Sequence, residues 1–304
     1  MYDAHFGLSA LPFSITPDTN FFFSHVSCQE ALNTLLIAAR SGEGFIKVVG
    51  EVGTGKTLLC RKFLSALEDE QFVTAYIPNP YLEPMTLLLA VADEFRVKYE
   101  PGINQHQLLK LLTQFLIDTH GQGRRAVLCL DEAQAMPIET LEALRLLSNL
   151  ETETSKLLQV VLFGQPELDT KLADPAIRQL QQRITFACRL GELGRSDVEY
   201  YLMHRLGIAG YRGPRLFSVD AVKLMHRASK GVPRLINILA HKSMLAAYGE
   251  GGRYITDKYV QLAIVDTESV NRATLGRRRW IGIAAVIAVV AILSIGAWFW
   301  VTKA

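Results

Sequence analysis

The sequence predicts an α/β fold with a parallel sheet covered by helices, followed by a smaller domain made of helices alone. Three observations predict it. Up to residue 190, short apolar runs alternate with segments in which apolar residues recur at helical spacing. A glycine-rich loop joins the first apolar run to a helical segment. From residue 191 to residue 267 only helical spacing remains, and a chain of 304 residues is long enough for both domains.

Five apolar runs are the expected strands of the sheet. They lie at residues 45–49, 73–77, 126–130, 157–163 and 184–190. Buried parallel strands read as near-continuous apolar runs because helices cover both of their faces. Segments between the runs, such as Pro84 to Lys98 and Gln105 to Thr119, have helical spacing. We therefore expect an α/β domain over residues 26–190.

The helical domain is expected at residues 191–267. Its segments of helical spacing read RSDVEYYLMHRL, SVDAVKLMHRAS, PRLINILAHKSMLAAY and TDKYVQLAIVD. Glycine and proline separate the first segment from the second, and glycines separate the third from the fourth. The spacing therefore predicts a separate helical domain.

Composition and charge exclude several classes of protein. Hydrophobic residues make up 49% of the chain and charged residues 20%, so it is neither disordered nor fibrous. The formal net charge is only +2, and Arg277–Arg279 account for part of it, which argues against nucleic acid binding. The scattered cysteines, without a C-x-x-C pair, suit neither a zinc site nor a disulfide scaffold: Cys28, Cys60, Cys129 and Cys188. The start MYDAHFGLSALPF does not read as a signal peptide, so we expect the body of the protein in the cytoplasm.

A phosphate-binding loop is predicted within residues 45–57, which read FIKVVGEVGTGKT. An apolar run, the pattern G-x-x-x-x-G-K-T and a helical segment follow one another, as a P-loop requires. The glycines let backbone N–H groups surround phosphates at the positive end of the helix. Lys56 would neutralise the β- and γ-phosphates of ATP, and the Thr57 hydroxyl would bind Mg²⁺. The expected nucleotide-binding residues are Gly50, Glu51, Val52, Gly53, Thr54, Gly55, Lys56, Thr57 and Leu58.

Two carboxylates, Asp131 and Glu132, directly follow the third apolar run. Ligands of parallel sheets bind at the carboxyl ends of the strands, so these side chains are expected beside the P-loop. Asp131 is placed to hold Mg²⁺ through water, and Glu132 is placed as the general base that polarises the attacking water. The alternative is a solvated loop, but the position after a buried strand favours a catalytic pair. Both carboxylates together predict hydrolysis of ATP and not binding alone.

Gln165 follows the fourth apolar run. A polar side chain at the end of this strand would lie beside the γ-phosphate and help to orient water. Taken alone, Gln165 reads as a loop residue, so its assignment depends on the other motifs.

Six stretches of the chain, three of which contain the motifs above, are specific enough to compare with a known family. They read YDAHFGLSALPFSITPDTNFFF, GEGFIKVVGEVGTGKTLLCRKF, LCLDEAQAM, LEALRLLSNLE, LQVVLFGQPEL and GVPRLINILAHK. Over about residues 1–270, the chain resembles the ExeA/GspA-like secretion ATPases, and among them those of mannose-sensitive haemagglutinin (MSHA) pilus biogenesis. The resemblance implies an AAA+ P-loop NTPase with a five-stranded parallel sheet flanked by helices and a helical lid. It also implies ATP hydrolysis in the assembly of a type IV pilus or of type II secretion machinery.

The resemblance assigns roles to two arginines. Arg183, just before the last apolar run, matches the position of an arginine finger, which reaches the γ-phosphate bound by a neighbouring subunit. Arg178 is the competing candidate. Arg234, after Pro233, matches the sensor-2 arginine at the start of a lid helix. The alternative for Arg183 and for Arg234 is an ordinary surface ion pair.

An aromatic arm at residues 1–25 precedes the α/β domain, with phenylalanines at Phe13 and Phe21–Phe23. In AAA+ proteins such an arm often packs against the adenine ring, but core packing is the favoured role for any single phenylalanine here. An arginine that acts in trans implies a homo-oligomer. The partner implied by the family is an inner-membrane pilus or secretion assembly component.

Two other functions remain open. An AAA+ fold also suits a DNA-associated regulator or loader of the transposition or replication type, although the near-neutral charge argues against it. A nucleotide-dependent scaffold without turnover is the second alternative, and the Asp131–Glu132 pair argues against that one.

A membrane anchor is predicted near the carboxyl end of the sequence. Residues 280–301 read WIGIAAVIAVVAILSIGAWFWV, without a charged residue, and at about 1.5 Å per residue they span roughly 33 Å, enough for a bilayer core of about 30 Å. The linker at residues 268–279 carries Arg277–Arg279, so the positive-inside rule predicts a single-pass protein of the bacterial inner membrane. Its body would be cytoplasmic and its carboxyl end periplasmic. Secretion members of the family add a periplasmic peptidoglycan-binding domain, which we do not expect from this chain.

Overall fold

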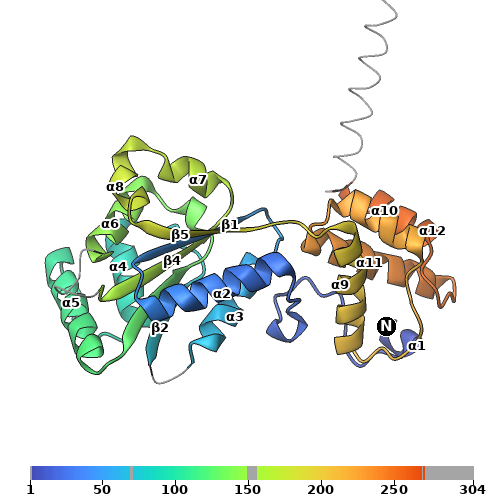
Figure 1. The fold of residues 1–304 in the computed structure, drawn as a ribbon, viewed down its shortest axis with the longest axis horizontal. Coiled ribbons are helices and arrows are strands. Elements are labelled where there is room, and N and C mark those ends of the chain that lie inside the picture. Colours follow the sequence, from blue (N-terminus) through green and yellow to red (C-terminus); the bar gives the residue numbers. More distant parts are fainter. Residues whose placement is uncertain (1, 69–70, 149–155, 269, 271–304) are drawn as a thin grey trace, which may run out of the picture. The chain divides into compact units, whose positions relative to one another are not determined.

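The computed structural model describes residues 2–68, 71–148, 156–268 and 270, and they form two compact units (Figure 1). The sheet unit consists of residues 15–208 together with residues 232–234. The lid unit consists of the described residues among 1–14, 209–231 and 235–304. Each unit is considered by itself below.

The sheet unit is built on five parallel strands in the order β2-β3-β4-β1-β5. The strands are β1 (Phe45–Gly50), β2 (Phe72–Ile77), β3 (Arg125–Leu130), β4 (Leu158–Gly164) and β5 (Ile184–Leu190). The predicted five-stranded parallel sheet is therefore confirmed, with strand ends within one residue of the expected ones. Because the strands are parallel and β1 pairs in register with β4, the carboxyl ends of β1, β3 and β4 meet at one edge.

Helices cover both faces of the sheet (Figure 1). One layer contains α2 (Val26–Ser41) and α3 (Lys56–Ala66). The other contains α4 (Pro84–Glu94), α5 (Gln105–Gly121), α6 (Ile138–Ser148), α7 (Glu167–Leu172) and α8 (Arg178–Gln181). Short 3₁₀ helices lie at η1 (Thr19–Phe21), η2 (Ala133–Ala135) and η3 (Pro175–Ile177).

Strand periodicity divides the apolar side chains of the sheet between two cores. In β3, Ala126, Leu128 and Leu130 pack in the core that includes α4, α5 and α6. Val127 and Cys129, which alternate with them, pack in the core that includes α2 and α3. Successive side chains of a strand point to opposite faces, so an unbroken apolar run is what a strand buried on both faces needs.

The lid unit is helical, as predicted, with α1 (Asp3–Phe6), α10 (Val219–Ser229), the larger part of α11 (Pro233–Gly249) and α12 (Asp257–Val265). The first residues of the chain belong to it, because Tyr2 is buried and its hydroxyl lies 2.8 Å from Nδ1 of His241. The helix α9 (Arg195–Ile208) groups with the sheet unit instead. The units thus divide at residues 14 and 208, whereas the sequence placed the boundaries at residues 25 and 190.

The predicted transmembrane helix at residues 280–301 lies outside the described residues, as does the linker at 268–279 except for residues 268 and 270. Within the described part of the chain, no helix has both the length and the apolar character needed to span a membrane.

Candidate functional site

The site begins at the loop between β1 and α3, and its backbone depends on two glycines. Gly53 has a φ of 83° and Gly55 a φ of 103°, values that side chains disfavour and glycine adopts freely. The hydroxyl of Thr54 donates to the carbonyl of Glu51 at 2.9 Å and braces the turn between them. The helix α3 starts at Lys56, so its positive amino-terminal end faces the loop. This geometry suits an anionic ligand.

Lys56 is buried against the loop, with only 5% of its surface exposed. Its ammonium group donates to the carbonyls of Gly50 at 2.8 Å and Glu51 at 3.0 Å. Burial lowers the pKa of Lys56, and the nearby carboxylates of Glu132 and Asp131 act against that shift. A buried cation beside backbone N–H groups is suited to bind the phosphates of a nucleotide.

Thr57 and Asp131 are in direct contact, although 74 residues separate them. The Thr57 hydroxyl donates to Oδ2 of Asp131 at 2.6 Å. Burial raises the pKa of Asp131, whereas the hydrogen bonds from Thr57 and from the N–H of Glu132 lower it. Hydroxyl and carboxylate oxygens are the ligands that Mg²⁺ prefers, and Mg²⁺ usually keeps several waters beside one or two such groups. The residues therefore fit a magnesium ion that is held partly through water.

Glu132 directly follows β3 at the carboxyl end and adopts a left-handed backbone conformation, with a φ of 54°. Two side-chain amides donate to its Oε2, from Gln134 at 2.6 Å and from Gln165 at 3.0 Å. Burial pushes the pKa of Glu132 upward, but the hydrogen bonds from Gln165 and Gln134 and the charge of Lys56 outweigh burial, so the net pKa is lowered. The carboxyl group is therefore ionised near neutral pH and is able to accept a proton.

The structure brings together five of the residues to which the sequence assigned chemistry. Four of them, Lys56, Thr57, Asp131 and Glu132, are linked by the contacts and charge interactions given above, and Gln165 joins them through Glu132. Each follows a strand at the same edge of the sheet, which is why residues far apart in sequence converge.

Arg234 also lies at the loop, since its backbone N–H donates to the carbonyl of Gly53 at 3.2 Å while the side chain is exposed. Arg183 lies elsewhere. It precedes β5, whose first residue Ile184 pairs with Phe45 at the start of β1. Arg183 is thus at the opposite edge of the sheet from the loop, about 20 Å away for a strand of six residues. The exposed Arg178, on α8, precedes it. Neither arginine belongs to the site of its own chain.

Two side chains of the site, Gln134 and Tyr76, were not predicted from the sequence. The Tyr76 hydroxyl donates to Oδ2 of Asp131 at 3.4 Å, and burial and the charge of Asp131 both raise the pKa of this phenol. Tyr76 lies near the carboxyl end of β2, the neighbour of β3 in the sheet. A polar residue near the end of a strand could therefore have pointed to Tyr76, but only if the order of the strands in the sheet had been known.

A small cavity of about 50 Å³ lies beside the P-loop, between the aromatic arm and α9. Phe21, Phe22 and Phe23 line one part of it, and Gly55 and Leu58 line another. Its walls are predominantly aromatic and apolar, as the walls of small-molecule sites usually are.

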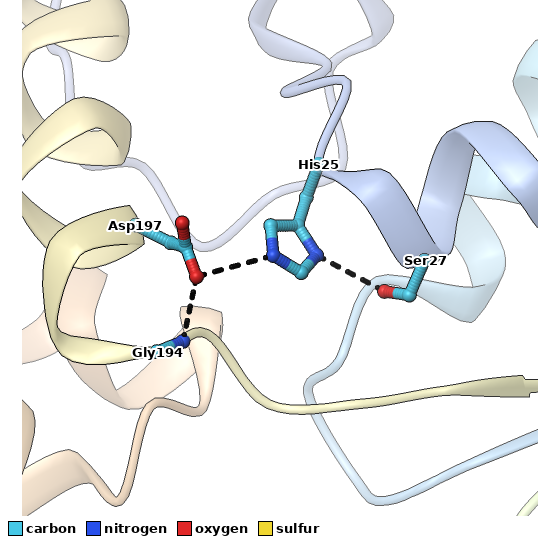
Figure 2. Close-up of polar contacts among 4 residues, drawn as sticks. All are labelled: His25, Ser27, Gly194 and Asp197. Atoms are coloured by element: carbon cyan, nitrogen blue, oxygen red, sulfur yellow. Dashed lines mark hydrogen bonds and ion pairs between the residues drawn. The ribbon is translucent and has the colours of Figure 1, made fainter.

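Polar contacts fix the arm to α9 next to this cavity (Figure 2). His25 lies between Ser27 Oγ, 3.1 Å from its Nδ1, and Asp197 Oδ2, 3.3 Å from its Nε2. Asp197 also accepts the N–H of Gly194 at 3.0 Å, in the first turn of α9. Arg205, buried on α9, places its guanidinium 4.8 Å from the centre of the Phe21 ring. Residues 21–25 of the arm are thus held in place beside the loop.

Gly53→Ala should weaken nucleotide binding at least about tenfold. A Cβ at Gly53 would lie 2.6 Å from Cβ of Arg234, and the positive φ would strain any side chain, so the contact between the loop and Arg234 must open. Gly102 is a matched control, because it has a φ of +81° and nothing lies within 4 Å of an added Cβ. Titration with a fluorescent ATP analogue should give wild-type affinity for Gly102→Ala. Equal affinity of both variants would show that the loop tolerates the change.

Comparison with known proteins defines the class to which the sheet unit belongs. Residues 39–172 match the family model described as an AAA domain, which includes the loop, both carboxylates and Gln165. The match implies nucleotide binding, in agreement with the loop geometry. The chain therefore contains a P-loop NTPase domain of the AAA type.

A curated relative is similar over nearly the whole chain. General secretion pathway protein A of Aeromonas hydrophila is 39% identical over 300 residues, which are 99% of this chain and 54% of that protein. The chain thus spans about half the length of this relative.

Several solved structures share the fold. They include Cdc6p from Pyrobaculum aerophilum, with a TM-score of 0.63 and 19% identity over 82% of this chain and 70% of that one. The ORC2 protein of Aeropyrum pernix has a TM-score of 0.59 and 16% identity over 83% of this chain and 72% of that one. The RuvB Holliday junction branch migration motor of Thermotoga maritima has a TM-score of 0.55 and 15% identity over 84% of this chain and 72% of that one. At these identities the likeness supports the fold alone, and with it the predicted α/β AAA+ fold with a helical lid is confirmed.

Proposed function

We propose that this chain is an ATPase that binds Mg²⁺ and ATP at the P-loop and hydrolyses the nucleotide. The observation that carries the proposal is the 2.6 Å hydrogen bond between Thr57 and Asp131. It lies beside a buried lysine, Lys56, and next to a hydrogen-bonded carboxylate, Glu132. A hydroxyl, two carboxylates and a lysine around one phosphate-binding loop are the groups that metal-assisted phosphoryl transfer uses.

Each group of the site has a separate role in this proposal. The loop N–H groups and Lys56 bind the phosphates, and Thr57 and Asp131 hold Mg²⁺, directly and through water respectively. The ion, when bound, neutralises charge on the phosphate oxygens. Glu132 accepts a proton from the attacking water, and Gln165 orients that water. Arg234 binds phosphate from the start of the lid helix, and the adenine ring packs against the aromatic arm.

Two measurements on this chain test the proposal. Binding of ATP should be tighter with Mg²⁺ than with EDTA, and phosphate should be released with ATP but not with a non-hydrolysable analogue. Binding without any release of phosphate would favour the nucleotide-dependent scaffold. Absence of binding in the presence of magnesium would end the proposal.

We further propose that Arg183 completes the site of a neighbouring subunit in a homo-oligomer. Arg183→Ala should keep ATP binding and lower turnover by about 10³-fold, the usual size of an arginine-finger effect. Arg178→Ala is the comparison, and loss of turnover in that variant alone would reassign the finger. A mixture of Arg183→Ala and Glu132→Gln chains should regain turnover, because mixed interfaces combine an intact arginine with an intact carboxylate. No recovery in the mixture would contradict action in trans.

The cellular role proposed is assembly of type II secretion machinery or of a type IV pilus of the MSHA kind. Similarity to general secretion pathway protein A supports the first, and the resemblance to MSHA pilus ATPases supports the second. The chain would work from the cytoplasmic face of the inner membrane, anchored by residues 280–301, on a membrane-bound assembly component. Neighbouring genes would separate the two pathways, and replication or transposition genes there would favour the DNA-associated alternative.

A further inference from the structure

The side chain of Gln134 bridges two residues with proposed roles in the reaction, Glu132 and Gln165. Its Nε2 donates to Oε2 of Glu132 at 2.6 Å, and its Oε1 accepts the backbone N–H of Gln165 at 3.0 Å. A carboxylate oxygen only accepts and a backbone N–H only donates, so a single orientation of the amide satisfies both partners. The donor and acceptor chemistry of the two partners therefore determines the orientation of the Gln134 amide.

The bridge closes a ring of three residues, because Gln165 also donates from its own Nε2 to the same Oε2 of Glu132 at 3.0 Å. Glu132 follows β3 and Gln165 follows β4, so the ring joins the ends of two adjacent strands. Gln134 is itself held in place. The ammonium group of Lys171, on α7, donates to the carbonyls of Gln134 and Met136, both at 2.6 Å.

The backbone conformation of Glu132 explains why its carboxylate needs to be held by this ring. A glutamate at a φ of 54° is strained by about 1 to 3 kcal/mol and persists only where its surroundings determine its position. The two amide donors hold the carboxylate at Oε2, and Gln134 gives the shorter of the two hydrogen bonds, while Oδ1 of Asp131 accepts the backbone N–H of Glu132 at 3.0 Å. Without Gln134, the carboxylate would keep a single side-chain donor from the ring.

We propose that Gln134 is a positioning residue that fixes the carboxylate of Glu132 and ties its position to Gln165. The inference rests on the proposed function, since it concerns how the general base of that reaction is oriented. It assigns no contact between Gln134 and the nucleotide. A displacement of Gln165 is transmitted to Glu132 through both amides, so the two residues act as one unit.

Two substitutions separate the two hydrogen bonds of the bridge. Gln134→Glu keeps an oxygen that accepts the N–H of Gln165 but replaces the donor to Glu132 by a second carboxylate. Gln134→Met keeps the length of the side chain and removes both hydrogen bonds. Gln122 is exposed at the end of α5 and provides matched controls, Gln122→Glu and Gln122→Met.

Steady-state hydrolysis by the full chain should show kcat reduced about tenfold or more in both Gln134 variants, since small misplacements of a catalytic group are costly. The KM and the Kd for ATP should stay within about twofold of wild type, and thermal unfolding should confirm that the variants are folded. The Gln122 variants should match wild type in every measurement.

Three results would overturn the inference. Wild-type kcat in Gln134→Glu, with a low kcat in Gln134→Met, would mean that only the backbone of Gln165 needs Gln134. Wild-type kcat in both variants would show that Gln134 has no role in turnover. A loss of ATP affinity as large as the loss of kcat would place Gln134 in binding instead. If the wild-type chain lacks turnover that depends on Glu132, the proposed function fails and this inference fails with it; in the other cases only the inference fails.

Discussion

Glu132→Gln is expected to bind ATP with wild-type affinity and to lose turnover by a factor of about 10² to 10⁴, the usual contribution of a general base. Glutamine has nearly the same shape but no charge to accept a proton. The amides of Gln134 and Gln165, which donate to Oε2, can still donate to the amide oxygen of the new side chain. The loss should therefore be in kcat, with the fold and the binding loop intact.

The measurement is steady-state phosphate release together with equilibrium binding of a fluorescent ATP analogue. Glu139→Gln is the matched control, because Glu139 is exposed in the first turn of α6 and makes the same change of charge outside the site. Turnover in Glu132→Gln equal to that of Glu139→Gln would show that another group activates the water. Loss of ATP binding would show instead that the carboxylate supports the loop.

The sequence was sufficient to predict the sheet and the core of the site. An apolar run before G-x-x-x-x-G-K-T fixes a strand, a loop and a helix, and parallel strands carry polar residues to one edge. Thr57 follows the first strand and Asp131 follows the third, so their contact could be predicted from the local patterns that mark these strands. Local patterns are enough for these side chains because parallel strands all end at the same edge of the sheet.

The remaining features depend on contacts that no local pattern encodes. Tyr76 reaches Asp131 because β2 is the neighbour of β3, and the order of strands is not readable from their composition. Gln134 reaches Glu132 because a left-handed residue turns the chain after β3, an unusual conformation for glutamate. The grouping of α9 with the sheet unit also depends on such contacts. Helix α9 has the spacing of a lid helix, but Arg205 and Tyr201 pack with the aromatic arm of the sheet unit.

Lys56→Met should lower the affinity for ATP by about 10- to 140-fold. A hydrogen bond from a charged donor contributes about 1.5 to 3 kcal/mol, and each 1.4 kcal/mol is a factor of ten in binding. Stability should change much less, because burial already disfavours the charged ammonium and lowers its pKa. Methionine retains most of the length that fills the space beside Gly50 and Glu51.

Lys62→Met is the matched control, since Lys62 lies on the same helix, α3, with its side chain exposed. Calorimetric titration with Mg²⁺ and ATP, together with thermal unfolding, separates binding from folding. A loss of affinity in Lys56→Met alone, at a similar unfolding temperature, is the expected result, because only Lys56 is buried at the amino end of the helix where the loop N–H groups converge. Equal affinities in the two variants would mean that the helix end and the loop backbone bind the phosphates without the lysine, and the charge at Lys56 would then need another explanation.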